Sequence, residues 1–466
     1  MEGGFSKALL ITTEDGMEVV AKIPCPNAGR AKYSTASEAA VLQYVSSHTT
    51  IPVPKILAWS ADSSNPVGAE YIIMEKAPGI QLFKVWDDIT QADRLNLIKG
   101  LTQFENQFAA IRFPAYGSLY FRHSISKASE RMLLDSSVDP AGLFCVGPAC
   151  GPAWTDGISP ADIQPDIDAG PWPTLLKFGL GLIKRSIART RLRPAGNTIP
   201  LLHGAVQDHV SILNATENLL PILTKHPPLL ERSRPTMWHT DLHMGNVFVS
   251  QEDHTRVMCL IDWQSTSISP LFLQARWPAF LSPPEGYCEG PEHPKLPENF
   301  DDLDADEKNI ALFEKDRATS AKAYEIATYL NNHDAYTAKW EIFGPLRELF
   351  SRIGDTWDDG VVPLRTCLIQ IVESWGQMGF PDPCPIHFTS AEIASHERQF
   401  SEYTQWHEIQ DFAQKYLDTD AEGWVPPGAD WAKKRLQNKA LLELMIERLE
   451  SQKLEGEVRR MWPFPP

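Results

Sequence analysis

Residues 238–249 read WHTDLHMGNVFV, and LIDW follows at residues 260–263. The first stretch carries Asp241 and, five positions later, Asn246 in one short polar loop, and the second adds Asp262. Phosphoryl-transfer enzymes need a base for the attacking hydroxyl and oxygen ligands for magnesium, both facing one small volume. The spacing therefore predicts that Asp241 is the catalytic base and that Asn246 and Asp262 bind the metal.

Two apolar runs follow the polar loop. Residues 247–249 and 257–261 are rich in β-branched side chains, and the polar residues 250–256 separate them. This pattern predicts a β-hairpin, with Asp241 before its first strand and Asp262 at the end of its second. The alternative is a polar turn between core strands, because short motifs also match by accident. The rest of the chain weighs against that alternative.

A second hairpin is predicted near the start of the chain. Residues 8–13 and 17–23 are strand-like runs, and Glu14-Asp15-Gly16 joins them. Asp-Gly between apolar runs is a strong hairpin signal. The second run ends in Val19-Val20-Ala21-Lys22, the form of the strand lysine that contacts the α- and β-phosphates in kinases. Lys22 is therefore a candidate phosphate ligand.

Two features beside this hairpin fit a nucleotide site. Gly3 and Gly4 precede the first strand, where glycine lets backbone amides approach phosphate closely. Glu38 lies near the start of a helix-like segment, residues 37–45, from which it can pair with Lys22. Each feature alone also fits a simpler reading, since acids are favoured at helix starts and glycines at flexible ends. Their order along the chain, together with the Asp241 loop, favours a kinase.

These residues carry a family resemblance. The chain is similar to the aminoglycoside phosphotransferase and choline kinase-like family, and within it to fungal phosphotransferase-family proteins of the altered-inheritance-of-mitochondria type. The resemblance implies an α+β, two-lobed protein-kinase-like fold, with a small antiparallel β-sheet N-lobe and a large, mostly helical C-lobe. The matching stretches are residues 2–5, 21–24, 37–38, 51–55, 70–79, the Asp241 loop and 261–264, with weaker matches at 384–386 and 423–425.

The resemblance also implies a role for each matching residue, with ATP and Mg²⁺ as cofactors. The backbone between the lobes would meet the adenine edge, the glycine-rich start would cover the phosphates, and the two loop histidines would shape the loop without transferring protons. The hinge would be Met74, Glu75, Lys76 and Ala77, and the phosphate cover would be Gly3, Gly4 and Phe5. Lys22 and Glu38 would form the lysine pair. Asp241 would be the base, and Asn246 with Asp262 would be the metal ligands.

The chain departs from the family pattern at its start. A kinase-like fold normally has a strand before the phosphate loop, whereas here that loop begins at residue 2. We therefore expect the first strand to be missing, the sheet to have an exposed edge and the loop to be mobile, because terminal segments are poorly ordered unless they are tied down.

The predicted boundary between the lobes lies where Ala77-Pro78-Gly79 interrupts the strand pattern. Residues 1–78 would form the nucleotide-binding N-lobe, and residues 79–466 the C-lobe with the catalytic loop, the metal site and substrate-binding helices. The proline-rich segments 148–173 and 282–297 would be surface connections. An acidic run at residues 301–307 would lead into a helix. The helix candidates are residues 91–111, 175–191, 204–220, 308–331, 363–375, 390–416 and 431–449.

Composition excludes some partners. The formal net charge of −17 argues against a nucleic-acid binder, which usually presents a basic face. It is compatible with a cationic substrate, although an acidic balance also simply keeps a protein in solution. The basic residues from Lys184 to Arg193 are predicted to lie on a packed helix with their charges in water rather than on a membrane. No uncharged apolar run is long enough for a transmembrane helix.

The compartment follows from weaker signals. Seven scattered cysteines without a paired spacing fit a reducing compartment, and neither they nor the 13 histidines form a zinc pattern. The start of the chain has neither a secretory signal nor a transit peptide, which predicts a cytoplasmic location. If a segment precedes it, the resemblance favours mitochondria. The oligomeric state stays open.

The sequence thus favours an ATP- and Mg²⁺-dependent phosphotransferase that acts on a hydroxyl group of a small molecule. A protein kinase is disfavoured, because His243 stands where such enzymes carry a lysine and Trp-Gln follows Asp262 in place of Phe-Gly. A kinase-shaped protein with little or no activity, and with a mitochondrial or partner-binding role, is the remaining alternative. It is argued from the missing first strand.

Overall fold

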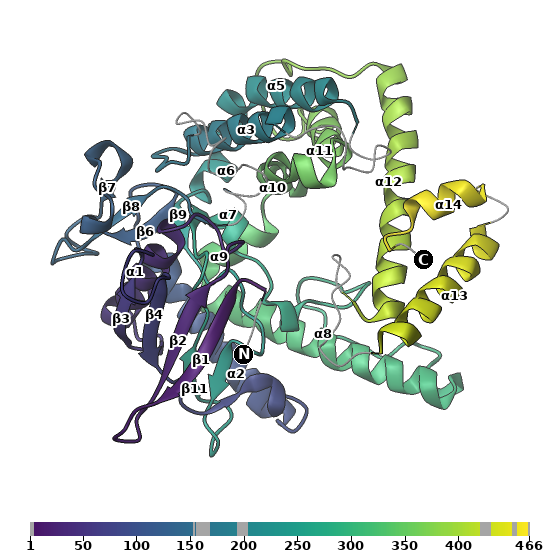
Figure 1. Ribbon diagram of the computed structural model, residues 1–466. Coiled ribbons are helices and arrows are strands. Elements are labelled where there is room, and N and C mark those ends of the chain that lie inside the picture. The colour runs from purple at the N-terminus through teal and green to yellow at the C-terminus, as the bar shows by residue number, and fades with distance from the viewer. Residues whose placement is uncertain are drawn as a thin grey trace. The chain divides into compact units, whose positions relative to one another are not determined.

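The structure is a computed structural model of the chain, shown in Figure 1, and it describes residues 4–151, 154, 168–192, 204–419, 430–449 and 454–464. The chain divides into two compact units, the first of Met1–Pro194 with Leu213–Asp355 and the second of Ala195–Ile212 with Thr356–Pro466. The predicted lobe boundary at residue 78 falls inside the first unit and stays a prediction. Gly3 and residues 423–425 lie outside the described residues.

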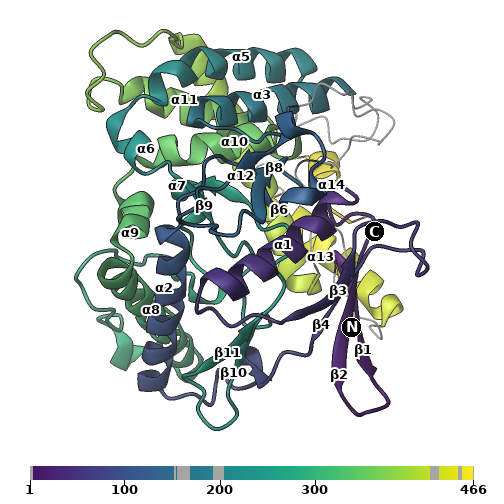
Figure 2. The ribbon, with the colours of Figure 1, turned by 90° about the vertical axis from the view of Figure 1, so that its left-hand side faces the viewer.

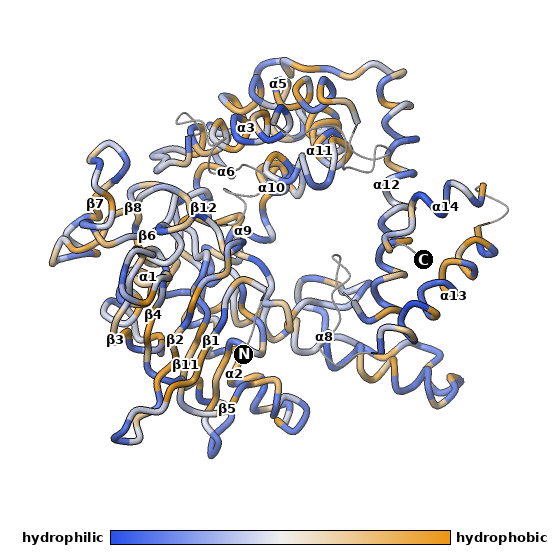
Figure 3. The backbone as a smooth tube through the Cα atoms, viewed as in Figure 1, coloured by the Kyte–Doolittle hydropathy of each residue, from blue (hydrophilic) through white to orange (hydrophobic). Residues whose placement is uncertain are grey.

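The N-terminal sheet has four strands in the order β1-β2-β4-β3, and all neighbours are antiparallel. The predicted first hairpin is confirmed as β1 and β2. Gly16 in its turn has φ +83°, a conformation that glycine adopts without strain. Figure 3 shows apolar residues along both strands. The four strands are Ser6–Thr12 (β1), Glu18–Pro24 (β2), Ile56–Ser60 (β3) and Tyr71–Glu75 (β4).

Strand β1 is an edge strand in the described part of the chain, where it pairs only with β2. Its side chains Leu9, Leu10 and Ile11 are 51%, 56% and 42% exposed. An edge strand is a template for pairing with another strand. Among the described residues, the sheet edge expected from the sequence lies at β1.

Helix α1 (Tyr33–His48) contains the predicted segment 37–45 and begins earlier, at Tyr33. It packs between the sheet, through β3 and β4, and strand β6 (Ser118–Phe121). Because it is covered on more than one side, even its small polar residues are buried, and it shows no simple apolar stripe. This position brings Glu38 against the sheet.

The Asp241 loop leads into a second, three-stranded sheet of order β11-β10-β5. The predicted second hairpin is confirmed as β10 (Val247–Val249) and β11 (Val257–Leu260), and β5 (Ile80–Gln81) pairs with β10. Two further sheets escape the sequence patterns because their strands have two to four residues. They are β9 (Pro235–Met237) with β12 (Ile268–Pro270), and β6 with β7 (Met132–Leu133) and β8 (Phe144–Gly147).

Helices make up most of the remaining first unit. Figure 2 shows α2 (Gln91–Ala110) and α8 (Ala305–Asn331) side by side. The predicted acidic run leads into α8 through a capping box, in which Asp304 accepts from the backbone N–H of Glu307 and Glu307 accepts from that of Asp304. Helix α9 (His333–Trp340), which follows, was not among the predicted helices.

The basic stretch forms the last turns of α3 (Leu175–Leu192). Lys184 is exposed as expected, but Arg185 and Arg189 are only 2% and 4% exposed, so the prediction that these charges lie in water is wrong for both. The guanidinium of Arg185 packs 5.2 Å from the ring centroid of Trp154, and an aromatic face is a favourable surface for a buried guanidinium. Among the described residues, no helix has the length and apolar character needed to cross a lipid bilayer.

The second unit is helical. Helices α12, α13 and α14 enclose a core that includes Ile409, Leu442 and Trp462. The predicted helices at 363–375, 390–416 and 431–449 are confirmed as α11 (Val362–Glu373), α12 (Ser390–Leu417) and α13 (Trp431–Leu449). Helix α14 (Glu455–Met461) was not predicted, and neither was α10 (Gly344–Asp359), most of which belongs to the first unit. The fold class is thus confirmed as α+β and protein-kinase-like, with an antiparallel N-terminal sheet and a mostly helical remainder.

Candidate active site

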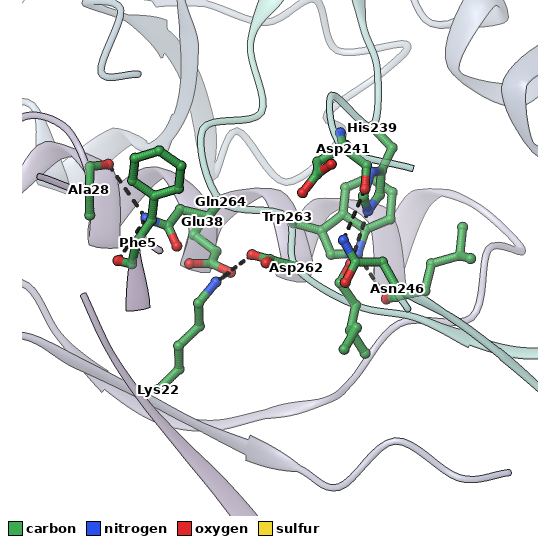
Figure 4. Close-up of polar contacts among 12 residues, drawn as sticks. Phe5, Lys22, Ala28, Glu38, His239, Asp241, Asn246, Asp262, Trp263 and Gln264 are labelled. Atoms are coloured by element: carbon green, nitrogen blue, oxygen red, sulfur yellow. Dashed lines mark hydrogen bonds and ion pairs between the residues drawn. The ribbon is translucent and has the colours of Figure 1, made fainter. Parts of the chain in front are cut away.

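Lys22 lies between two carboxylates that come from distant parts of the chain (Figure 4). Its Nζ is 2.6 Å from Oε1 of Glu38 on α1 and 2.7 Å from Oδ1 of Asp262, which follows β11. The side chains of Lys22 and Glu38 are 10% and 6% exposed, and that of Asp262 is 38% exposed. The structure therefore brings together three residues that the sequence singled out separately.

The charges of this group stabilise one another. Burial disfavours the charged amine, but the attraction of Glu38 and Asp262 outweighs it and raises the pKa of Lys22. Burial also opposes the charge of Asp262, and again Lys22 outweighs it, so that the pKa of Asp262 is lowered. Burial raises the pKa of Glu38, an effect that the attraction of Lys22 reduces. Lys22 consequently keeps its charge at neutral pH.

His239 joins the loop of Asp241 to the loop of Asp262. The backbone N–H of Asp241 donates to its Nδ1 at 3.3 Å, and its Nε2 donates to the carbonyl oxygen of Ile261 at 2.9 Å. This pair of contacts requires the neutral tautomer with the proton on Nε2. Burial lowers the pKa of His239, which favours the same neutral form. The imidazole thus fixes the relative position of the two loops, as Figure 4 shows.

Asn246 is oriented by the same loop. Its Nδ2 donates to the carbonyl oxygen of Asp241 at 2.9 Å, and its own carbonyl accepts from the N–H of Ile261 at 3.0 Å. Its Oδ1 has no hydrogen bond within the described part of the chain. This oxygen and the carboxylate of Asp262 are hard donors of the kind that Mg²⁺ prefers, and Mg²⁺ commonly takes few protein ligands beside substrate phosphates. The donor set therefore fits magnesium.

Asp241 itself points into open space, since its side chain is 66% exposed. Nε2 of His243 lies 3.7 Å from its Oδ2, and Nδ1 of His243 accepts from the N–H of Gly245 at 3.0 Å. An exposed carboxylate beside a turn is free to meet an incoming hydroxyl group. The backbone contact of His243 matches its expected part in shaping the loop.

A cavity of about 670 Å³ lies over the lysine group. Lys22, Glu38 and Asp262 form part of its wall, and all four residues of the expected hinge, Met74 to Ala77, line it as well. Ala8 and Leu10 of β1 add apolar wall. The volume lies within the range of nucleotide-sized and drug-sized pockets. The sequence patterns did not single out three polar lining residues, Gln81, Lys84 and Gln251.

The segment before β1 does not line this cavity, although Gly4 and Phe5 were expected to cover phosphates there. It is held from two sides. The carbonyl of Phe5 accepts from the N–H of Cys25 at 2.9 Å and from Nε2 of Gln264 at 3.5 Å, and the carbonyl of Gly4 accepts from Nδ2 of Asn27 at 3.1 Å. The expectation of a loop without support is thus corrected for these two residues. Gln264 lies in the matching stretch 261–264, although no role was expected of it, and no motif marked Asn27 beforehand.

A second cavity, of about 380 Å³, lies on the other side of the Asp241 loop. His239 and Asp241 belong to its wall, together with two tryptophans, Trp238 and Trp277, and one buried acid, Glu105. Sequence reasoning did not find this cavity, because its wall comes from α2, the Asp241 loop and residues 267–279, which only the fold brings together.

Residues 1–273 match the phosphotransferase enzyme family (APH), and the chain belongs to this family. The resemblance noted from the sequence is confirmed.

Several known proteins are similar to the chain. A subtelomeric hrmA-associated cluster protein of Aspergillus fumigatus is 28% identical, over 99% of this chain and 95% of its own length. Altered inheritance of mitochondria protein 9, mitochondrial, of Saccharomyces cerevisiae is 22% identical, over 91% of this chain and 72% of its own length.

Solved structures are more distant. A putative fructosamine-3-kinase from Thermobifida fusca has a TM-score of 0.37 at 14% identity, over 79% of this chain and 91% of that one. The ternary complex of APH(2")-IIa with streptomycin and ATP has a TM-score of 0.36 at 12% identity, over 82% and 93% of the two chains.

Proposed function

We propose that this chain transfers the γ-phosphoryl group of Mg-ATP to a hydroxyl group of a small molecule. The nucleotide would occupy the cavity over Lys22, and the acceptor would occupy the cavity beside Asp241. Membership of the phosphotransferase family supports the reaction class. The lysine held by two carboxylates supports the position of the phosphates, because a charged amine in a partly closed site attracts them strongly.

Each residue of the site has a part in this reaction. Lys22 would donate to oxygens of the α- and β-phosphates, and Glu38 would keep its amine aimed at them. Asp241 would accept the proton of the acceptor hydroxyl as the oxygen attacks phosphorus. Asn246, through Oδ1, and the carboxylate of Asp262 would hold Mg²⁺, which neutralises charge on the phosphate oxygens when it is bound.

The observation that carries this proposal is the bridge made by His239. The proposed metal ligand Asp262 lines one cavity, and the proposed base Asp241 lines the other. The neutral imidazole of His239 ties the two loops together through hydrogen bonds of 3.3 and 2.9 Å. An in-line transfer needs donor and acceptor held at a fixed separation, and a rigid link between the two loops provides it.

Titration calorimetry with ATP, with and without MgCl₂, tests the proposal. We expect ATP to bind more tightly with magnesium present, and Asp262→Asn to abolish that difference while ATP still binds. Asp301→Asn, at an exposed acid outside both cavities, serves as the matched control and should bind as the native chain does. If the native chain binds no nucleotide in the presence of magnesium, the enzyme function has to be abandoned.

The alternative is a kinase-shaped protein that binds a partner without turnover. The yeast relative is named as a mitochondrial protein. Under this alternative, our chain would have a mitochondrial role. Nucleotide binding without ADP release, across a broad panel of hydroxylated metabolites, would favour it. Imaging of a tagged chain beside a mitochondrial marker tests the location separately.

A further inference from the structure

The wall of the cavity beside Asp241 has few acidic groups, whereas a site that attracts cations to an acidic protein would have many. The indole rings of Trp238 and Trp277 contribute its aromatic surface. The hydroxyl groups of Ser267 and Ser269 lie 3.2 Å apart in the same wall. Apart from Asp241, its acidic lining consists of Glu105 alone, which is 4% exposed. The chemistry of this cavity therefore depends on the charge of Glu105.

The hydrogen bonds of Tyr324 bear on that charge. Its Oη lies 3.1 and 2.9 Å from the two carboxyl oxygens of Glu105, and 3.2 Å from the carbonyl oxygen of Arg276. A phenol has one proton to donate, and a carbonyl group can only accept. Both contacts are hydrogen bonds at once only if Glu105 is protonated and donates to Oη, while the phenol donates to Arg276. An ionised Glu105 would take the phenol proton and leave the carbonyl of Arg276 without it.

Burial favours the same protonated form. It raises the pKa of Glu105 to about 8, and the opposing effects of Tyr324 and Lys339 are smaller. Lys339 on α9 stays uncharged at neutral pH for the same reason, because burial lowers its pKa to about 6. Its Nζ lies 3.5 Å from the ring centroid of Trp277 and has no hydrogen-bond partner in the described part of the chain. At neutral pH burial therefore favours the uncharged form both of Glu105, in this wall, and of Lys339, which lies against Trp277 outside it.

The other ionisable groups around the cavity are already engaged. His239 is neutral, as its two hydrogen bonds require. The guanidinium of Arg276 is turned to the carbonyl of Leu273 at 2.9 Å and to Oγ of Ser351 at 3.2 Å. Among the described residues of this wall, Asp241 is thus the acidic side chain left for the reacting hydroxyl. A cationic guest would therefore meet its counter-charge at Asp241, where the reaction takes place, rather than at the buried Glu105.

We propose, resting on the function proposed above, that Glu105 is a specificity-determining residue and that its protonated form selects an uncharged polyol or sugar over an amine-bearing analogue. With its proton donated to Tyr324, the protonated carboxyl of Glu105 offers the guest an uncharged acceptor, to which a hydroxyl group can donate. The two indole faces offer flat apolar surface to the C–H face of a hydroxylated ring. A guest ammonium would force Glu105 to ionise and so break its link through Tyr324 to Arg276.

Saturation-transfer NMR on the chain loaded with magnesium and a non-hydrolysable ATP analogue tests the selection. The probes are D-glucose, myo-inositol and ribitol, each beside its amine-bearing analogue of similar size. We expect at least one uncharged probe to bind, and to bind more tightly than its amine partner. A preference for the amines overturns the proposal, as does the absence of binding by every uncharged probe while the nucleotide is bound. Loss of nucleotide binding would instead contradict the proposed function.

Two variants test the part played by Glu105. Glu105→Gln keeps a donor and an acceptor without charge, so it should bind the preferred probe within about twofold of the native affinity, whereas Glu105→Leu should weaken binding by about tenfold or more. Native affinity should fall above pH 8 as Glu105 ionises, and that of Glu105→Gln should not. Equal losses in both variants, or the same pH profile in the native chain and Glu105→Gln, would overturn the proposal. Unchanged nucleotide binding in each variant shows that the first unit is folded.

Discussion

The two cavities on either side of the Asp241 loop use opposite electrostatics. Over Lys22, the amine lies within hydrogen-bond distance of Glu38 and Asp262, which raises the pKa of Lys22 and lowers that of Asp262. Beside Asp241, burial instead raises the pKa of Glu105 to about 8 and lowers that of the nearby Lys339 to about 6, because it outweighs the attraction between the two groups. A charged group survives burial only when it is paired. We infer that the first cavity is built for an anion and the second for a neutral guest.

The largest expected effect comes from removing the base between the cavities. Asp241→Ala should lower kcat by roughly two to four orders of magnitude, the range for loss of a general base, with ATP affinity nearly unchanged. Steady-state ADP release and calorimetry measure the two quantities. Asp301→Ala removes an exposed carboxylate elsewhere and should leave both unchanged. A loss of less than about threefold in Asp241→Ala would mean that Asp241 is not the base.

The second-largest effect concerns the free energy of unfolding, which tests the pairing of Lys22 in the charged cavity. Lys22→Met leaves Glu38 and Asp262 without their cation, and breaking a buried pair in this way costs about 3 kcal/mol or more in the free energy of unfolding. Urea denaturation measures that loss. Lys127→Met breaks the exposed pair with Glu130 and should cost much less, because solvent screens an exposed pair. Similar losses in the two variants would contradict the special role of the buried pair.

The neutral cavity predicts a pH dependence of stability. The pKa of Glu105 rises from 4.5 in the unfolded chain to about 8 in the folded one, so between these values the folded chain binds the extra proton. Stability from this group is therefore complete below pH 4.5 and is lost as the pH rises through 8. Glu105→Gln should gain thermal stability over the native chain at pH 8.5 and gain little at pH 5.

The difference between the native chain and Glu105→Gln isolates this group from the opposite trend of Lys339, whose lowered pKa makes stability rise with pH. Glu314→Gln, at an exposed glutamate of α8, serves as the control and should show no such pH trend. A gap between native chain and Glu105→Gln that stays constant from pH 5 to 8.5 would mean that Glu105 is ionised throughout.

The smallest effect is expected at the edge of the charged cavity. Gln264 links the carbonyl groups of Phe5 and Ala28 through contacts of 3.5 and 3.4 Å, which are long for hydrogen bonds. Gln264→Ala should raise KM for ATP by about threefold and leave kcat nearly unchanged, since one such contact contributes about 1 kcal/mol or less. Gln251→Ala, which truncates a residue of the cavity wall, separates loss of the tether from loss of cavity wall. An unchanged KM in Gln264→Ala would mean that the contacts of Gln264 do not affect ATP binding.

The same contrast explains what the sequence could predict. Lys22, Asp241 and Asp262 stand in local patterns, because a strand lysine or a loop before a hairpin is encoded by its neighbours. Glu105 lies inside the regular helix α2, where nothing beside it distinguishes a buried acid from an exposed one. Its environment comes from Tyr324 and Arg276, more than 150 residues away along the chain. Reaction class is thus readable from short motifs, whereas selectivity depends on tertiary contacts.

The fold likewise has features that local sequence predicts and features that depend on tertiary contacts. The turn at Asp15-Gly16 and the helices with clear ends could be predicted because local chemistry decides them. The burial of Arg185 and Arg189 could not, since a basic run looks solvated until tertiary structure covers it. Strands of two to four residues, such as β7 and β9, carry too few positions for an alternating pattern.

The exposed apolar side chains of β1 also affect how the chain behaves in concentrated solution. Leu9, Leu10 and Ile11 lie exposed on one strand, and two such apolar surfaces can associate. Because Leu10 also lines the cavity over Lys22, in which we propose that ATP binds, association at this strand would alter the wall of that cavity. The apparent affinity for nucleotide would then vary with protein concentration. A titration at a single protein concentration could not separate self-association of the chain from nucleotide binding.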